Sequence, residues 1–246
     1  MSDAPLLLRP DWPAPANVIA AVSTRRGGVS CGAYASLNLG SHVGDEPEAV
    51  AENRRRFAAA AGLAEAPAWL NQVHGCGVVA AGAAEQASAD ACWSRSPGTA
   101  CAVLTADCLP VLFVDRAGSC VAAAHAGWRG LAAGVLEATI ASLPAAPAQL
   151  MAWLGPAIGP RAFQVGSEVR AAFMAVAPAD AAAFVPDGER WLADIYQLAR
   201  ARLARAGVPA VYGGGLCTVS DAKHFFSHRR DGLSGRFASV IALALD

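Results

Sequence analysis

A long apolar run that could cross a membrane is missing from this sequence. The longest stretch without a charged residue, 138–160, is interrupted by four prolines, which a membrane-spanning helix tolerates poorly. The first ten residues also lack the basic region and the complete apolar segment of a secretory signal. We therefore expect a cytoplasmic protein without a membrane partner.

An excess of charge of either sign is missing as well. The chain has 19 lysine and arginine residues against 20 aspartate and glutamate residues, which leaves a net charge of −1 and an isoelectric point near 6.5. Such a balance offers no general attraction to nucleic acid. We expect a small-molecule partner and no nucleic-acid partner, and the sequence predicts no oligomeric state.

A regular set of cysteines, the mark of a secreted disulfide scaffold, is also lacking. The seven cysteines are odd in number and irregularly spaced along the 246 residues. Most of them are therefore expected to be reduced. Cys101 and Cys120 lie within apolar runs, so we expect both to pack as small hydrophobic side chains.

Patterns typical of strands and helices interleave along the chain, which predicts an α/β fold. Apolar runs predict strands over 18–22, 101–104, 111–114, 120–124, 151–154, 210–212 and 237–245. Helical spacing is present over 47–61, 130–142, 169–177 and 192–206. We expect Arg200, Arg202 and Arg205 to lie on the outer face of the last helix. A chain of 246 residues can form one or two domains, and no change in composition marks a domain boundary.

Three side chains with the chemistry of metal ligands lie at or near the ends of apolar runs. Cys108 follows one predicted strand, His125 ends another, and His74 lies upstream in the string Asn-Gln-Val-His-Gly. Zinc favours thiolate and imidazole ligands, and a catalytic zinc site usually leaves its fourth position open. We hypothesise that these three residues bind one zinc ion. Their separations of 34 and 17 residues match no compact finger motif, so two buried histidines and a buried thiol are the alternative interpretation.

The same residues also permit two other kinds of site. Cys108 could be a nucleophile with His125 as its base, as in a cysteine hydrolase. This role is an alternative to the zinc site, because zinc binding and nucleophilic attack compete for one thiolate. A zinc-binding scaffold without turnover would instead need a fourth protein ligand, for which His42 and His224 are the candidates. Asp107 could carry a proton or could cap the end of a strand.

Arginines in glycine-containing loops are candidates for binding an anion. Arg26 precedes paired glycines, which let backbone N–H groups approach an oxyanion while the guanidinium binds it. Arg129 directly precedes a predicted helix, whose N-terminus could face the same anion. A surface turn with solvated arginines is the alternative for the Arg26 loop.

Five strings in the order 71–75, 105–110, 125–130, 155–160 and 225–232 carry most of the polar and glycine residues discussed above. Together they resemble the YfiH or laccase-domain family of purine nucleoside phosphorylases, also called polyphenol oxidases. The likeness extends from the Arg26 loop to the C-terminus. His228 stands where the family commonly has tyrosine.

The resemblance implies that residues 1–246 form a single α/β (α+β) domain of layered sheets and helices, similar to the fold of cytotoxic-necrotising-factor-like cysteine hydrolases. It also implies a zinc ion held by His74, Cys108 and His125. It implies phosphorolysis of adenosine, inosine and S-methyl-5′-thioadenosine, with adenosine deamination as a second reaction. Copper-dependent oxidation of phenols is also attached to the family name. A full multicopper oxidase needs many histidines, however, and this chain has five.

The function expected from the sequence is therefore a zinc-dependent phosphorylase that binds a purine nucleoside and phosphate. Cys108 and Asp107 are the expected catalytic residues. The residues expected to bind substrate or phosphate are Arg26, Asn38, Asn71, Arg129 and Arg229. The alternatives are a metal-free cysteine hydrolase that edits a cell-wall precursor and a copper-dependent polyphenol oxidase.

Overall fold

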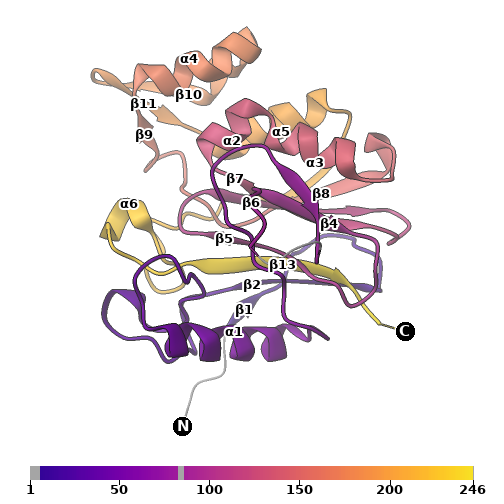
Figure 1. Cartoon of the computed structure of the whole chain (residues 1–246). Coiled ribbons are helices and arrows are strands. Elements are labelled where there is room, and N and C mark those ends of the chain that lie inside the picture. Colours follow the sequence, from indigo (N-terminus) through magenta and orange to yellow (C-terminus); the bar gives the residue numbers. More distant parts are fainter. Residues whose placement is uncertain (1–5, 83–85, 246) are drawn as a thin grey trace.

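The structure, a computed structural model, describes residues 6–82 and 86–245 and is built around two stacked sheets (Figure 1). The six-stranded sheet has the order β12 (Ala210–Gly213), β8 (Leu150–Leu154), β6 (Leu109–Asp115), β7 (Val121–Ala126), β4 (Ala91–Ser94) and β3 (Val78–Ala80). The four-stranded sheet has the order β1 (Leu7–Leu8), β2 (Val18–Ser23), β13 (Phe237–Leu243) and β5 (Cys101–Thr105). The pairs β12–β8 and β3–β4 are parallel, and the other pairs in these sheets are antiparallel.

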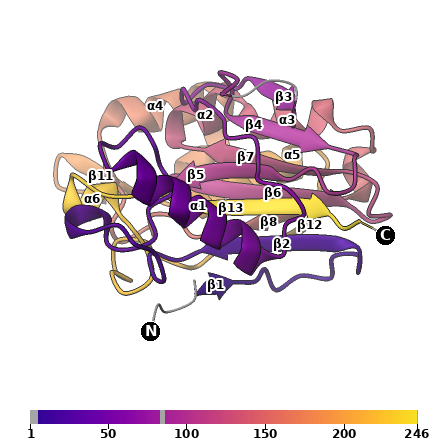
Figure 2. The same cartoon turned by 60° about the horizontal axis from the view of Figure 1, so that its bottom comes forward.

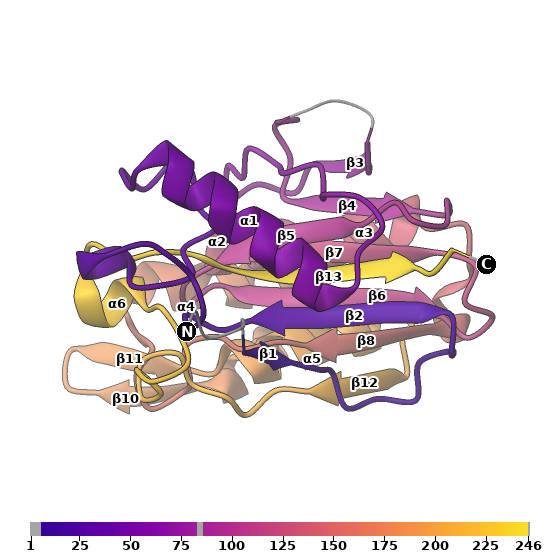
Figure 3. The ribbon, with the colours of Figure 1, turned by 90° about the horizontal axis from the view of Figure 1, so that it is seen from below.

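Helices cover the outer face of each sheet. Helices α2 (Trp128–Ala133), α3 (Val135–Ser142) and α5 (Ile195–Arg205) lie over the six-stranded sheet, and α1 (Pro47–Ala61) lies across the four-stranded sheet (Figures 1 and 2). Figure 3, seen from below, places α1 in front of β2 and β13. A smaller sheet of β10 (Phe184–Asp187), β11 (Arg190–Ala193) and β9 (Gln164–Val165) accompanies α4 (Ser167–Val176). The last helix, α6 (His228–Asp231), directly follows Ser227, whose hydroxyl accepts from the N–H of Arg230.

Alternation along the central strands explains this layering. In β6, Leu109, Val111 and Phe113 pack toward the helices, whereas Leu112 and Val114 pack between the two sheets. A strand buried on both faces must be apolar at every position, which is why β6 reads as a continuous apolar run. The hydrophobic core thus has three layers. One lies between the helices and the six-stranded sheet, one between the two sheets, and one between the four-stranded sheet and α1.

The predicted α/β (α+β) architecture of several sheets and helices is confirmed, and most strand predictions agree with the observed bounds. Cys101 and Cys120 are buried, as expected. The strand predicted over 237–245 ends at Leu243, and the segment 78–89, for which no helix or strand was predicted, contributes the short strand β3. Residues 83–85 of that segment lie outside the described residues. The similarity to cysteine hydrolases stays a prediction.

Two helix predictions were wrong in detail. The helix predicted over 130–142 is two helices, because Gly134 adopts φ 99°, a left-handed conformation that ends α2 and starts α3. The helix predicted over 192–206 begins only at Ile195, where the Asp194 side chain accepts from the N–H groups of Tyr196 and Gln197.

Arg202, expected on the outer face of that helix, is in fact buried. Its guanidinium donates to the carbonyls of Leu131 and Ala132 and forms an ion pair with Glu137. The last carbonyls of a helix have no partner within the helix, so Arg202 supplies donors to the end of α2. In the described part of the chain, none of the helices has the length and hydropathy needed to cross a bilayer.

The break at Gly134 gives a testable consequence. Gly134→Ala should lower the free energy of unfolding by about 1–2 kcal/mol, because a Cβ is strained in the left-handed region. Gly77→Ala is the matched control, since Gly77 lacks this conformation and an added Cβ would meet its nearest neighbours at 3.7 Å. Urea denaturation measures both variants. Equal stability of the two would contradict the proposed strain.

Candidate metal centre and active site

The three predicted metal ligands come together at one end of the central strands. Cys108 directly precedes β6, His125 lies in β7 opposite Pro110, and His74 reaches the same point from the loop before β3. Their ligand atoms all lie within 4.8 Å of one another. The rings of His74 and His125 are 4.8 Å apart between centroids and stand edge to face. The residues are thus placed to bind one ion.

Burial falls from one side of this cluster to the other. His125 is buried, Cys108 is half-buried and His74 is exposed. Two imidazoles and one thiolate suit zinc, and the same donors bind copper. Among residues 6–82 and 86–245, the cluster includes no fourth side chain that could be a ligand. The donor set therefore fits a metal site with an open position.

Asp90 holds two of the three ligands in place. Its fully buried carboxylate lies 2.8 Å from Nδ1 of His125 and accepts from the backbone N–H groups of Val73, His74 and Gly75. The backbone N–H of His125 in turn donates to the Asp90 carbonyl at 2.7 Å. With Nδ1 of His125 donating to Asp90, Nε2 would be the nitrogen available to bind a metal ion. Asp90 also supports His74 at a left-handed φ of 60°.

Charge in the cluster favours a thiolate. Burial would raise the pKa of Cys108, but the charges and hydrogen bonds of His125 and His74 lower it to about 6. Burial would lower the pKa of His125, but the thiolate and Asp90 raise it to about 9. Burial would likewise raise the pKa of Asp90, and its bonds to His125 and Gly75 lower it. The two imidazoles therefore favour the thiolate form of Cys108, which is the form that binds a metal.

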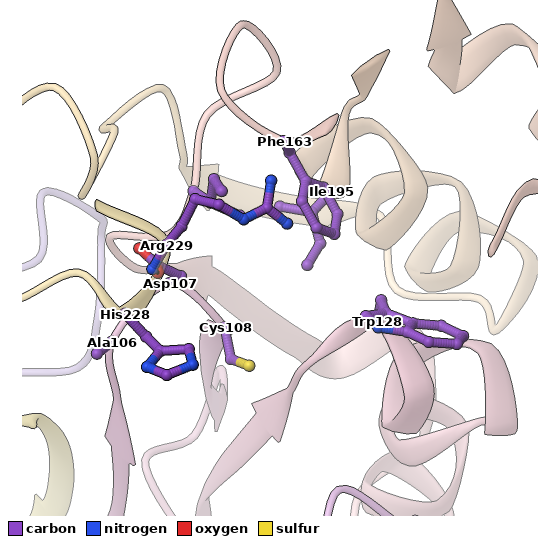
Figure 4. A pocket seen from close by; sticks show the side chains of 9 residues that line it. Ala106, Asp107, Cys108, Trp128, Phe163, Ile195, His228 and Arg229 are labelled. Carbon is purple, nitrogen blue, oxygen red and sulfur yellow. The ribbon is translucent and has the colours of Figure 1, made fainter. Parts of the chain in front are cut away.

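Two cavities adjoin Cys108. The apolar cavity, of about 190 Å³, is lined by Ala106, Asp107, Cys108, Trp128, Ile158, Phe163, Ile195, His228 and Arg229. Figure 4 shows the Cys108 sulfur beside His228, with Phe163 and Ile195 across the space. The polar cavity, of about 310 Å³, is lined by His42, Gln72, His74, Leu104, Thr105, Ala106, Cys108, His125, His228 and Arg236. All three residues of the metal cluster thus line the polar cavity, and Cys108 lines the apolar cavity as well.

Asp107, the predicted proton carrier, has a structural role in joining two segments of the chain. It has a φ of 96°, accepts from the Thr218 hydroxyl at 2.6 Å and accepts from the backbone N–H of Arg229 at 2.6 Å. It thereby joins the loop before β6 to the start of α6. This anchoring resembles the backbone-capping alternative, and the catalytic role of Asp107 stays a prediction.

The predicted anion-binding arginines are more scattered than expected. Arg26 is exposed, and the exposed Arg129 stacks on Trp128 with its guanidinium carbon 4.5 Å from the ring centroid. Arg229 lines the apolar cavity, where it donates to the carbonyls of Ala162 and Gln164. Neither Arg26 nor Arg129 lines either cavity.

The two predicted asparagines have other partners. Asn38 is fully buried, and its amide donates to the Gly40 carbonyl and to Asp45 while accepting from the N–H groups of Gly40 and Arg236. All four hydrogen-bonding positions of the Asn38 side chain are used, so none is left to bind a substrate. Asn71 donates to the Ser88 hydroxyl at 3.0 Å.

The remaining histidines differ in their relation to the cluster. His42 and His228 line the polar cavity, whereas His224 is bound to Asp221 at 2.9 Å. Sequence reasoning missed Asp90 and Arg236 completely. Asp90 stands immediately before an apolar strand and Arg236 immediately before the last one, but an isolated charge at a strand end is too common to single out.

Comparison with known proteins identifies the family. The model of the multi-copper polyphenol oxidoreductase laccase family matches residues 19–244. A purine nucleoside phosphorylase of Pseudomonas aeruginosa is 59% identical over 238 residues, covering 96% of this chain and 98% of that protein. The purine nucleoside phosphorylase YfiH of Escherichia coli is 58% identical over 239 residues, covering 96% of this chain and 98% of that protein. The chain belongs to the YfiH or laccase-domain family.

Solved structures of similar proteins agree with this membership. A protein of Neisseria meningitidis has a TM-score of 0.94 at 53% identity and covers 99% of this chain and 100% of its own. YlmD from Geobacillus stearothermophilus has a TM-score of 0.91 at 31% identity and covers 100% of this chain and 98% of its own. These values confirm the fold over the length of the laccase-domain chain.

The family description mentions several copper ions, but this laccase-domain chain offers fewer ligands. In the part of the chain that the structure describes, one group of three or more potential metal ligands is present, made of His74, Cys108 and His125. A multicopper oxidase requires further histidine-rich sites. The ligand set therefore fits one metal ion better than several.

The role of Asp90 can be tested through metal affinity. Asp90→Asn should weaken metal binding by about 10- to 100-fold, because the His125 ring and the loop of His74 lose their shared anchor. Asp115→Asn is the control, since Asp115 is also buried and accepts from Ser119 and Cys120, but at the opposite end of β6. Competition with a chromophoric chelator measures both. Similar affinities in the two variants would contradict the anchoring role.

The charge state of Cys108 can be tested in metal-free protein. The rate of alkylation by iodoacetamide should fall as the pH falls through about 6, because the thiolate is the reactive form. His125→Asn should move this midpoint upward, since the positive charge beside the sulfur is removed. Peptide mass spectrometry separates Cys108 from the other cysteines. A midpoint near 9, unchanged in the variant, would show that the imidazoles do not stabilise the thiolate.

Proposed function

We propose that this laccase-domain protein is a zinc-dependent purine nucleoside phosphorylase. The observation that carries the proposal is that His74, Cys108 and His125 line a polar cavity that also contains Arg236, while Cys108 lines an apolar cavity with aromatic walls as well. A purine nucleoside and phosphate differ in the same way, since the base is flat and apolar and phosphate is an anion. The names of the two relatives described above support the same reaction.

In the proposed reaction, the purine base binds in the apolar cavity, where Trp128 and Phe163 provide aromatic surface. An oxygen of phosphate attacks C1′ of the sugar while the bond from C1′ to the base nitrogen breaks. The base leaves with the electron pair of that bond and takes up a proton. Asp107 lines the apolar cavity and is the proposed carrier of that proton.

Zinc, held by His74, Cys108 and His125, would supply Lewis acidity to a substrate group beside it. The protein's own part is to fix the ligands through Asp90 and to hold the reactants on either side of Cys108. We propose adenosine, inosine and S-methyl-5′-thioadenosine as substrates, with deamination of adenosine as a second reaction. We further propose that residues 1–246 act as one domain in the cytoplasm.

A second candidate function rests on the same side chains. The low pKa of Cys108, its pairing with His125 and the bond from His125 to Asp90 form a Cys-His-Asp arrangement, which suits a metal-free cysteine hydrolase. The two functions differ in their need for metal. A phosphorylase of the proposed kind requires the metal, whereas the hydrolase would be blocked by it.

The test combines elemental analysis with an assay for free base and ribose 1-phosphate. Zinc-loaded protein should release both products only when phosphate is present, and Cys108→Ala should lose zinc and lower the rate by roughly 100-fold or more. Cys31→Ala is the control, because Cys31 is exposed and lies outside both cavities. Full phosphorolysis without bound metal would refute the scheme. Faster amide hydrolysis after chelation would favour the hydrolase, and copper-dependent phenol oxidation alone would favour the oxidase.

A further inference from the structure

The polar cavity contains the guanidinium of Arg236, which forms no ion pair with a carboxylate of the described residues. Burial lowers the pKa of Arg236, while the charges of Cys108 and Asp107, beyond ion-pair distance, raise it. Arg236 lines this cavity, and Nη1 of its guanidinium donates to neutral acceptors, namely the carbonyls of Ser234 and Gly235 and the Ser234 hydroxyl. Among the described residues, Arg236 has no ion-pair partner and its Nε and Nη2 have no hydrogen-bond acceptor. Arginine with free N–H groups facing a cavity is suited to bind an oxyanion.

The imidazole of His42, which is neutral at pH 7, and the guanidinium of Arg54 accompany Arg236. His42 lines the polar cavity, and its pKa is lowered first by burial and then by the charges of Arg236 and Arg54. Arg54 donates to the Leu39 carbonyl and the Ser41 hydroxyl, and within the described chain it has no carboxylate partner. The carboxylate of Asp45 is already occupied by the Ser30 hydroxyl, the Asn38 amide and the N–H of Glu46.

The backbone around Arg236 is fixed by the buried asparagine. The Arg236 N–H donates to Oδ1 of Asn38 at 2.8 Å, and the Arg236 carbonyl accepts from the N–H of Leu39 at 2.9 Å. Gly40 leaves room for the side chain, because a Cβ there would lie 2.9 Å from Cγ of Arg236. Asn38 is thus a positioning residue for Arg236. Asn38 therefore acts by holding the Arg236 backbone and does not need to contact the substrate.

The two cavities adjoin Cys108 and differ in most of their lining residues. The apolar cavity is built by residues of α2, α5, α6 and the segment after β8. The polar cavity is built by the end of β5, by His125 of β7, by the loops of His42 and His74, and by Arg236 directly before β13. Ala106, Cys108 and His228 belong to both. A displacement at C1′ needs the attacking and leaving groups on different sides of the sugar, and this arrangement provides two such sides.

We propose that the polar cavity is the phosphate site, with Arg236 and His42 as the side chains that bind the anion. This inference rests on the proposed function and replaces Arg26, Arg129 and Arg229 as the phosphate ligands. Of these, Arg26 and Arg129 lie outside both cavities, and Arg229 is directed to backbone carbonyls beside the aromatic wall.

The test measures KM for phosphate and for nucleoside separately in zinc-loaded protein. Arg236→Met should raise KM for phosphate by about 10- to 100-fold, because a hydrogen-bonded charge is lost, and should change KM for nucleoside by less than about 3-fold. Arg236→Lys should give an intermediate value, since it keeps the charge without the two-pronged geometry. Arg116→Met is the control, because Arg116 is exposed and follows the opposite end of β6.

Calorimetry with inorganic phosphate gives a second readout that does not depend on turnover. Phosphate binding should weaken in Arg236→Met and in His42→Asn, and zinc content should stay at the level of the unmodified protein. His42 is exposed, so its replacement tests the site even if Arg236→Met folds poorly. Normal KM for phosphate in both variants, with a raised value in Arg129→Met or Arg229→Met, would overturn the inference while leaving phosphorolysis intact.

Failure of the proposed function has a different signature. If the unmodified protein releases no base from any of the three nucleosides, phosphorolysis is refuted. Calorimetric phosphate binding that still depends on Arg236 would then support the anion site alone. Absence of phosphate binding in the unmodified protein would overturn the anion site as well.

Discussion

The contact of Asp90 with both His125 and the loop of His74 is the constraint on which the rest of the site depends. A buried carboxylate is costly unless donors surround it, and here three backbone N–H groups and one imidazole do so. The same bonds that make the carboxylate tolerable bring two ligands from separate parts of the chain to Cys108. Stability and metal chemistry are therefore linked through one side chain.

The stacked sheets explain why the site is two-sided. The strands β5 and β6 belong to different sheets, and the short turn between them carries Asp107 and Cys108. A residue in such a turn can face the helical layer on one side and the four-stranded sheet on the other. The apolar cavity is built largely by residues of the helical layer. The polar cavity is built by residues at the end of β5 and before β13, together with His42, His74 and His125. A thiolate at this junction can contact two chemically unlike reactants at once.

The parts of this structure that follow local pattern could be predicted from sequence. Cys108 and His125 end or follow apolar runs, so their approach at one edge was foreseeable, and His74 was recognisable from its string. The helical spacing of apolar residues continues without a change across Gly134, so the sequence did not reveal that the helix breaks there. Arg202 looked exposed because helical spacing does not reveal that the carbonyls of α2 need donors. Arg236, His42 and Asp90 gain their meaning from neighbours far along the chain, which no local pattern encodes.

X-ray absorption at the zinc edge tests the central claim most directly, because it reports the ligands themselves. The account predicts one sulfur at about 2.3 Å, two imidazoles at about 2.0–2.1 Å and one light ligand that changes when phosphate or nucleoside is added. A shell without sulfur, a shell with several sulfurs, or four protein ligands that ignore substrate would contradict it.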